Sequence, residues 1–343
     1  MPWPAPQSTR RRSRRTLRLI FLGDVMLGRL VNRQLRTVPP AFPWGDTLPV
    51  LAQADIRFAN LECVLADGGT PQPGKVFHFR SDARNTAVLT AAGIDAVSLA
   101  NNHVLDYGAD AFRETLPALD RSGILHAGAG PDLETARRPA IRRAGPAAVG
   151  LIAFTDNEPD WEAGPHRPGV YYVPVDARQH DDGRVHDLLA LVRRTKARAD
   201  LLVVSAHWGG NWGAEVPSAH RDLARALVDA GTDVVFGHSA HIFRGVELYR
   251  GRPLIYSAGD FIDDYAVDPG ERNDQSFIFC LDTAGGVPSR LQLHPTVIAG
   301  FQVRLAGKSS RHIATRMQGL SAQLGTQSRW IDESNVLEVP VDS

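Results

Sequence analysis

The sequence predicts an α/β fold, and two observations carry this prediction. Segments rich in apolar and β-branched residues alternate along the chain with segments of helical pattern, which is typical of a sheet covered by helices. Residues 201–206 are almost entirely apolar, as strands covered on both faces are. A chain of 343 residues with 43% hydrophobic and 22% charged residues has the composition of an ordinary soluble enzyme and can bury a substantial core.

The predicted elements follow one another in a regular order over most of the chain. Strands are expected at 17–23, 56–61, 94–99, 124–127, 148–155, 201–206 and 233–236, and helices at 46–54, 83–92, 110–122, 182–199 and 217–230. Gly93 closes the second of these helices and Pro217 lies at the start of the last one, positions that both residue types favour. In the final third, 246–249, 254–257, 276–281 and 290–297 are expected to be consecutive antiparallel strands, and a helix over 311–324 precedes a polar tail. Surface loops are expected at 157–167 and 267–274.

No internal repeat and no clear linker divides the sequence, so we expect one main domain over 17–300, followed by a helix and tail over 301–343. Arginines are concentrated just before this domain, and a Ser-Arg-Arg sequence among them loosely resembles a twin-arginine export signal. The apolar stretch that follows has about six residues, which is shorter than the roughly 7–15 of a signal sequence. We therefore expect a disordered basic arm over 1–16 and a first core strand behind it.

The charge and hydropathy of the chain exclude some classes of partner. The formal net charge is +0, so no global field favours nucleic acid, a membrane surface or an acidic substrate. The basic arm can touch nucleic acid or anionic lipid, but it has no interleaved aromatic residues and a solvated tail is favoured. No apolar run reaches the roughly 18 residues of a membrane-spanning helix. We expect a cytoplasmic protein with no membrane anchor and no nucleic-acid partner.

Histidines outnumber cysteines in a way that bears on metal binding. The chain has twelve histidines but only two cysteines, Cys63 and Cys280. Two cysteines are too few for a disulfide framework or a cysteine-based zinc site. Any metal would therefore be held by histidine and carboxylate side chains, a ligand set that suits Mn, Fe, Zn or Mg.

Polar residues able to hold a metal ion follow five of the predicted strands at their carboxyl ends, where ligands bind in open α/β folds. Each of them has an ordinary alternative when taken alone, such as an N-cap, a solvated strand end, an asparagine turn or a packed core histidine. The recurrence at five strand ends favours one shared metal site over five coincidences. The residues are Asp24, Glu62, Asn102, His103, His207, His238 and, three positions later, His241.

Side chains of these types point to hydrolytic chemistry. Carboxylates and imidazoles at strand ends can hold one or two divalent ions, and two such ions lie about 3.5–4 Å apart. The ions generate a hydroxide nucleophile from water and stabilise the charge that develops on a phosphoryl group. A histidine that is not a ligand can protonate the leaving oxygen. We assign this role to His103, because the adjacent Asn102 would be the ligand that places it over the site.

Six short segments of the sequence match those of a known protein family in their order and spacing. They are 21–29 (FLGDVMLGR), 59–62 (ANLE), 98–108 (SLANNHVLDYG), 205–209 (SAHWG), 237–241 (GHSAH) and 253–261 (PLIYSAGDF). In order and spacing they resemble the CapA family of poly-γ-glutamate capsule biosynthesis proteins, which belongs to the calcineurin-like metallophosphoesterase superfamily. The resemblance covers about residues 17–265 and implies a four-layer α/β/β/α sandwich.

The resemblance also implies roles for single residues. Asp24 matches the first metal aspartate, and Glu62 falls where the bridging aspartate sits. Asn102 and His103 match the Asn-His pair, and the later histidines at 207, 238 and 241 match metal ligands.

Several positions depart from these patterns. Met26 stands in place of the superfamily's second histidine, and a glutamate in place of the bridging aspartate moves the bridge by one methylene. The last two metal histidines are separated by two residues where phosphoesterases usually have one. Within the CapA family, Ser239-Ala240 replaces a common His-Pro, and Asp260 replaces a common asparagine.

Further residues are expected around the site. Arg29, Asn101, Trp208 and Asn211 are expected to contact the substrate, and the segment 75–80 carries cationic residues that can neutralise an anion. Asp106 and Asp260 are expected to orient the histidines from behind. Asp263 and Asp264 are interpreted as surface charge.

Together these observations predict a metal-dependent hydrolase that acts on a phosphoester or related bond of an anionic small molecule or polymer. Two alternatives stay open. The first is an accessory protein that binds an anionic polymer such as poly-γ-glutamate without turnover, alongside partner biosynthetic proteins. The second is a hydrolase of γ-glutamyl amide bonds, since a metal hydroxide also attacks carbonyl carbon. Proteins of the CapA family are typically membrane-anchored, whereas no anchor is recognisable in this sequence.

Overall fold

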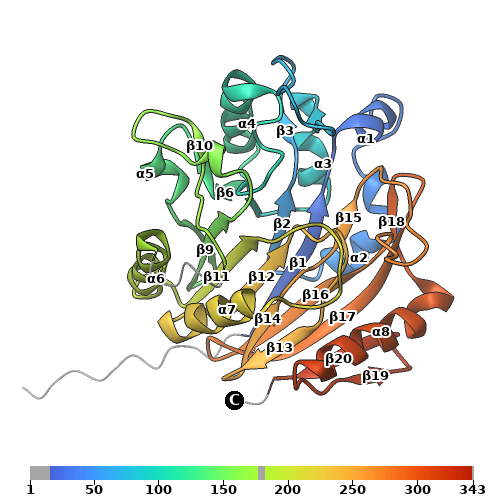
Figure 1. The fold of residues 1–343 in the computed structure, drawn as a ribbon. Coiled ribbons are helices and arrows are strands. Elements are labelled where there is room, and N and C mark those ends of the chain that lie inside the picture. Colours follow the sequence, from blue (N-terminus) through green and yellow to red (C-terminus); the bar gives the residue numbers. More distant parts are fainter. Residues whose placement is uncertain (1–15, 177–181, 342–343) are drawn as a thin grey trace, which may run out of the picture.

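The computed structural model describes residues 16–176 and 182–341, which form two large sheets accompanied by helices (Figure 1). The α/β class predicted from the sequence is confirmed. The predicted basic arm, apart from Thr16, lies outside the described residues.

The larger sheet has ten strands and a parallel half. Strands β1 (Leu17–Val25), β2 (Ile56–Leu61), β5 (Ala96–Ser98) and β6 (Leu125–Ala127) lie side by side and parallel in this order. Beyond β1 the sheet continues with antiparallel neighbours, β16 (Gln275–Ala284), β17 (Val287–Ala299), β20 (Val336–Pro340) and β19 (Arg329–Ile331). Two short strands extend it, β15 (Asp260–Ile262) beside β1 and β18 (Gln302–Leu305) beside β17.

The smaller sheet has six strands with a parallel centre. Its parallel strands are β9 (Ala147–Thr155), β11 (Leu201–His207), β12 (Val234–His238) and β14 (Arg252–Ile255). The antiparallel edge strands are β8 (Ala140–Ala144) and β13 (Val246–Tyr249). Two-stranded pairs are formed by β3 (Val64–Leu65) with β4 (Arg80–Ser81), and by β7 (Ala129–Gly130) with β10 (Gly169–Val170).

Helices occupy the connections between strands. The longer ones are α4 (Gly108–Arg121), α6 (Gly183–Lys196), α7 (Ser218–Ala230) and α8 (Ser310–Gln323). The short ones are α1 (Arg29–Gln34), α2 (Leu48–Leu51), α3 (Thr86–Ala91) and α5 (Leu133–Ala136). Four 3₁₀ turns complete the described set, η1 (Phe42–Thr47), η2 (Ala83–Asn85), η3 (Pro159–Trp161) and η4 (Gly307–Ser309).

Successive residues of the central strands face two different cores, because side chains alternate along a strand. In β1, Leu19 and Phe21 belong to one core, whereas Ile20 and Leu22 belong to another. The core of Leu19 and Phe21 also contains residues of the smaller sheet, and the Phe21 ring lies 5.4 Å from that of Phe236 in β12. The two sheets therefore face each other across this shared core.

Helices cover the outer face of each sheet. Leu89 of α3 and Phe112 of α4 pack in the core on the outer side of the larger sheet, with Ile20 and its neighbours. Leu188 of α6 and Leu227 of α7 pack in the core on the outer side of the smaller sheet. This burial on both faces explains why the central strands are continuous apolar runs in the sequence.

The C-terminal segment corrects the sequence prediction of a polar tail. Strand β20 pairs with β17, and its residues Leu337 and Val339 are buried in the core between the sheets. Ile313 and Met317 of α8 pack in the same core. The residues after 301 therefore continue the main sheet. The sequence did not indicate this, because these strands are short and have one charged face.

The four strands expected as one antiparallel run are divided between the sheets. β13 and β14 form a hairpin in the smaller sheet, whereas β16 and β17 form a hairpin in the larger one. Strand β15, which the sequence did not predict, lies between them along the chain and joins the larger sheet beside β1. Apolar runs mark strands but do not say to which sheet each strand belongs. In the described part of the chain, we find no helix with the length and apolar character needed to cross a membrane.

Candidate metal centre

The carboxyl ends of parallel strands from both sheets meet at one place. In the larger sheet, Asp24 of β1 is the register partner of Asn60 in β2, and Glu62 directly follows β2. In the smaller sheet, His207 ends β11 and is the register partner of His238, which ends β12. His238 Nδ1 lies 4.0 Å from Asp24 Oδ1, so the two sheets contribute to one cluster.

Two groups of side chains in this cluster can each hold a divalent ion. One group is Asp24, His207 and His238, and the other is Asp24, Glu62 and His241. Within each group the ligand atoms lie within 4.8 Å of one another, and every member is buried. Asp24 is the carboxylate common to both groups, whereas the family resemblance suggested Glu62 as the bridge. The geometry therefore favours Asp24 as the shared ligand.

Unpaired carboxylate oxygens show that the cluster fits a cation. Among the described residues, Asp24 Oδ2, Glu62 Oε1 and Asp260 Oδ2 are buried and have no hydrogen-bond partner. The other oxygens of Asp24 and Glu62 accept hydrogen bonds from Asn60 Nδ2 at 2.8 and 2.9 Å. A buried charge without a partner is costly, and a divalent ion would supply the missing partner.

Burial sets the protonation preferences of the cluster. It raises the pKa of Asp24, and it raises the pKa of Glu62 well above the usual value, helped by the charges of Asp24 and Asp260. Burial also lowers the pKa of His207 well below its usual value and lowers that of His238 to about 3. Neutral imidazoles are the form that binds metal, so the histidines are ready to act as ligands at neutral pH.

The two histidines of the smaller sheet converge on a common point. Their Nδ1 atoms lie 2.8 Å apart, and Ser205 Oγ lies 2.7 Å from His238 Nε2. With Nε2 of His238 bonded to the serine, its Nδ1 is left to face His207 and Asp24. Ring nitrogens at this separation can bind one ion at the usual distance of about 2.0–2.1 Å.

The expected asparagine ligand lies at the site, beside a histidine. Asn102 Oδ1 is 3.1 Å from His207 Nε2, and His207 Nε2 lies 4.0 Å from Glu62 Oε1. Direct binding of the metal by Asn102 stays a prediction. Met26, by contrast, is fully buried in the core on the helix side of the larger sheet and contributes no ligand atom.

His103 and Asp106 form a pair at the edge of the cluster. His103 Nδ1 lies 2.6 Å from Asp106 Oδ2, and its Nε2 lies 3.8 Å from Glu62 Oε1. Burial lowers the pKa of His103, although the carboxylate of Asp106 acts in the opposite direction. Lys75 Nζ lies 2.9 Å from the second oxygen of Asp106 and also donates to the carbonyl of Asn102. The predicted orienting role of Asp106 agrees with this geometry.

Asp260, which was expected behind the metal ligands, has its Oδ1 2.8 Å from His241 Nδ1. The interpretation of Asp263 and Asp264 as surface charge is wrong. Asp263 is 4% exposed, and burial together with Asp260 raises its pKa well above the usual value. Asp264 accepts a hydrogen bond from the backbone of Leu30 and lies 3.4 Å from Arg29 Nε. Both aspartates follow the short strand β15, which has no clear signal in the sequence.

Two of the four residues expected to contact substrate have other roles. Trp208 is fully buried, donates from Nε1 to the carbonyl of Tyr256 and stacks on His220, so it does not line a cleft. Asn101 is also fully buried, and its amide bonds Asn60, Leu61 and His103. Its position holds the cluster together instead of facing a substrate.

The other two are at least partly exposed. Asn211 is exposed in the loop after β11. The Arg29 side chain is 29% exposed and lies over the rings of Phe77 and Phe79, while its Nη1 is without a hydrogen-bond partner among the described residues. The Phe79 ring is in turn 4.7 Å from that of His103. Nη1 itself is buried, so Arg29 holds an unpaired donor one aromatic ring away from His103.

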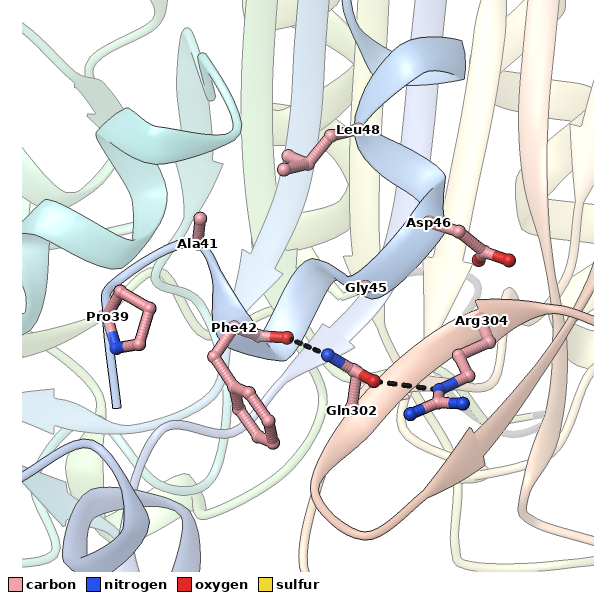
Figure 2. A pocket seen from close by; sticks show the side chains of 8 residues that line it. All are labelled: Pro39, Ala41, Phe42, Gly45, Asp46, Leu48, Gln302 and Arg304. Carbon is pink, nitrogen blue, oxygen red and sulfur yellow. Dashed lines mark hydrogen bonds between the residues drawn. The ribbon is translucent and has the colours of Figure 1, made fainter. Parts of the chain in front are cut away.

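A surface groove of about 450 Å³ lies elsewhere, between η1 and β18 (Figure 2). Its polar groups bond one another: Gln302 Nε2 donates to the carbonyl of Phe42, and Arg304 Nε donates to Gln302 Oε1. Asp46 Oδ1 accepts from the backbone of Leu305. None of its lining residues belongs to the metal cluster.

Two facing sheets whose parallel strands bring buried carboxylates and imidazoles to one point define a protein with a metallophosphoesterase-like fold. The sequence pattern of the family described as bacterial capsule synthesis protein PGA_cap matches residues 18–265, and the chain belongs to this family.

Curated relatives agree with this assignment. A probable polyglutamine synthesis accessory protein of Mycobacterium tuberculosis (strain H37Rv) is 34% identical over 300 residues, which cover 84% of this chain and 78% of the relative. The PGA biosynthesis protein CapA of Bacillus subtilis is 28% identical over 71% of this chain and 62% of its own length. Among solved structures, a hypothetical protein from Thermus thermophilus matches 81% of this chain with a TM-score of 0.50 and 18% identity, which indicates a shared fold only.

Proposed function

We propose that the protein is a metal-dependent hydrolase that acts on a phosphoester or related bond of an anionic substrate. The observation that carries this proposal is the pair of ligand groups that share Asp24, with unpaired carboxylate oxygens between them and a histidine–aspartate pair alongside. When bound, the ions would supply Lewis acidity that activates water and stabilises developing negative charge. Asp24, Glu62, His207, His238 and His241 would hold them.

His103 is positioned to move a proton at the reacting group. Its Nδ1 is held by Asp106, which leaves Nε2 facing Glu62 and the interior of the cluster. An anionic substrate beside Nε2 stabilises the imidazolium and raises the pKa of His103 toward neutral pH. The protonated ring can then donate its Nε2 proton to a leaving oxygen, which is general acid catalysis.

Two cationic side chains favour an anionic substrate. Arg29 has its unpaired Nη1 near the cluster, and Lys75 lies between Asp106 and Glu158 and over the ring of Trp161, with its side chain 17% exposed. Arginine binds both carboxylate and phosphate groups through its paired donors. Together with the family of the chain, this favours a polyanion or a phosphoester over a neutral substrate.

An accessory role without turnover is the second proposal, and the Mycobacterium tuberculosis relative, whose name describes an accessory protein, favours it. On this reading the metal cluster would bind carboxylates of a polymer, or order the strand ends, without hydrolysis. Partner biosynthetic proteins would then carry out the chemistry.

The test begins with metal content and ends with turnover. We expect the protein purified without chelator, or reconstituted with Zn together with Mn or Fe, to contain two equivalents of metal by elemental mass spectrometry. Asp24→Asn should lose both equivalents, because Asp24 belongs to both ligand groups. Phosphomonoesters, phosphodiesters and γ-glutamyl peptides are then screened with the loaded protein. Turnover of a phosphoester supports the hydrolase, turnover of the γ-glutamyl peptide alone identifies an amide hydrolase, and metal with no turnover supports the accessory role.

A further inference from the structure

The two ligand groups form two halves of the metal cluster, and these halves differ in the ligand atoms that they offer once Asp260 is included. The half at the end of the smaller sheet offers two ring nitrogens, from His207 and His238. The half beside β2 offers carboxylates from Asp24 and Glu62 and one ring nitrogen from His241. Asp260 adjoins this second half through His241.

The backbone is built to bring Asp260 beside Asp24. The two residues are register partners in the parallel pairing of β1 with β15, and Asp24 N donates to the carbonyl of Gly259 at 2.9 Å. This approach leaves no room for side chains at two glycines: a Cβ on Gly23 would lie 1.7 Å from Gly259 O, and one on Gly237 would lie 2.2 Å from Tyr256 O. The segment 256–260 therefore packs closely against the strand ends of both sheets.

The atoms of Asp260 face the second half of the cluster. Its Oδ1 lies 2.8 Å from His241 Nδ1, and the same nitrogen lies 3.6 Å from Asp24 Oδ2. Asp260 Oδ2, Asp24 Oδ2 and Glu62 Oε1 are all buried and unpaired. Three carboxylates, each with a buried unpaired oxygen, and one imidazole match the oxygen-rich surroundings that hard divalent ions prefer.

We propose that Asp260 is a direct metal ligand, and that with Asp24, Glu62 and His241 it forms an oxygen-rich half-site for a hard divalent cation such as Mn²⁺. The half with His207 and His238 is nitrogen-rich and suits a softer ion such as Zn²⁺. This inference rests on the proposed function only in that both require the cluster to bind metal. The alternative is that Asp260 merely orients His241 by accepting a hydrogen bond from Nδ1.

Two substitutions separate a ligand from an orienting group. Asp260→Asn keeps an acceptor oxygen for His241 Nδ1 but removes the negative charge. An orienting role would weaken Mn²⁺ binding by about 10–100-fold but leave the ligand atoms of the bound ion unchanged, whereas loss of a ligand also changes the Mn²⁺ electron paramagnetic resonance spectrum. Asp260→Ala removes both functions. Asp264→Asn is the matched control, because Asp264 is also a buried carboxylate near the site but is bonded to Leu30 and Arg29.

Binding of Mn²⁺ and Zn²⁺ to the metal-free protein is measured separately, by titration calorimetry and by Mn²⁺ electron paramagnetic resonance. We expect wild type and Asp264→Asn to bind one equivalent of Mn²⁺ tightly with the same spectrum, Asp260→Asn to bind it at least tenfold more weakly and with a changed spectrum, and Asp260→Ala to lose it. Zn²⁺ binding to the nitrogen-rich half should persist in both Asp260 variants and be lost in His238→Ala.

The outcomes distinguish this inference from the proposed function. Wild-type Mn²⁺ affinity in Asp260→Asn, or weaker binding with the wild-type spectrum, overturns the inference and leaves Asp260 as an orienting group. Parallel loss of Zn²⁺ and Mn²⁺ in Asp260→Asn overturns the division into two unlike halves. Failure of the wild-type protein to bind either ion overturns the proposed function itself.

Discussion

Asp106 Oδ2 lies 2.6 Å from His103 Nδ1 and also accepts a hydrogen bond from the backbone N–H of Phe79 at 2.7 Å. The backbone of Phe79 therefore holds the carboxylate in place, and the carboxylate sets the orientation of the imidazole. Because Asp106 binds Nδ1, the ring must present Nε2 to the cluster, where Glu62 Oε1 is 3.8 Å away. A histidine held this way presents one defined nitrogen to the cluster, and because His103 belongs to neither ligand group, we assign it to proton transfer.

Replacing His103 should therefore reduce turnover without removing metal. We expect His103→Ala to lower kcat by about 10²–10⁴-fold, the usual contribution of a general acid, with an unchanged metal content by elemental mass spectrometry. His312→Ala, at an exposed position of α8, serves as the control. Loss of a metal equivalent in His103→Ala would contradict this assignment and make His103 a ligand.

Arg29 should act on binding of the substrate more than on its conversion. Arg29→Met keeps an apolar side chain over the rings of Phe77 and Phe79 but removes the charge and the unpaired Nη1. We expect KM for an anionic substrate to rise about tenfold, a loss of about 1.4 kcal/mol, with kcat little changed. Arg33→Met, at an exposed position of the same helix, should leave KM unchanged. An equal KM in both variants would exclude Arg29 from recognition.

Most of the metal cluster could be predicted from the sequence because its residues end long apolar strands. Asp24 and His207 each close a run that is buried on both faces, and such runs are visible without a structure. Trp208 was misplaced because β11 extends through His207, so that the next side chain alternates to the helix side of the sheet and packs in that core. The burial of Asp263 could not be predicted from the sequence, because it depends on β15. This strand has only three residues, and its position is set where the chain passes from the smaller sheet to the larger one.

His294 on β17 should make the stability of the protein depend on pH. Burial, with a smaller effect of Arg18, lowers the pKa of His294 from 6.5 to about 4. Below pH 6.5 the unfolded chain takes up a proton that the folded protein does not accept until about pH 4, so stability falls as the pH falls through this window. From pH 7 to pH 5 this residue should reduce the free energy of unfolding by about 2 kcal/mol. Urea unfolding at both pH values should show a loss smaller by this amount in His294→Gln, and an equal loss in both proteins would exclude the residue as the cause.

Gly23 should be essential to both the fold and the metal cluster. A Cβ at this position would lie 1.7 Å from Gly259 O, so Gly23→Ala must push the segment before Asp260 away from β1. We expect a loss of more than about 2 kcal/mol in the free energy of unfolding, as for other overpacked core positions. Any folded fraction should also bind Mn²⁺ more weakly, because Asp24 and Asp260 would no longer be aligned.

The control is Gly319→Ala in α8, where nothing lies within 4 Å of an added Cβ and the position is exposed. There the substitution should stabilise the protein by about 0.4–1 kcal/mol, since alanine favours the helix and restricts the unfolded chain. Thermal and urea unfolding of the two variants, each with and without Mn²⁺, measure both effects. Wild-type stability and Mn²⁺ affinity in Gly23→Ala would mean that β15 can shift without loss, and that its alignment with β1 does not hold Asp260 at the metal.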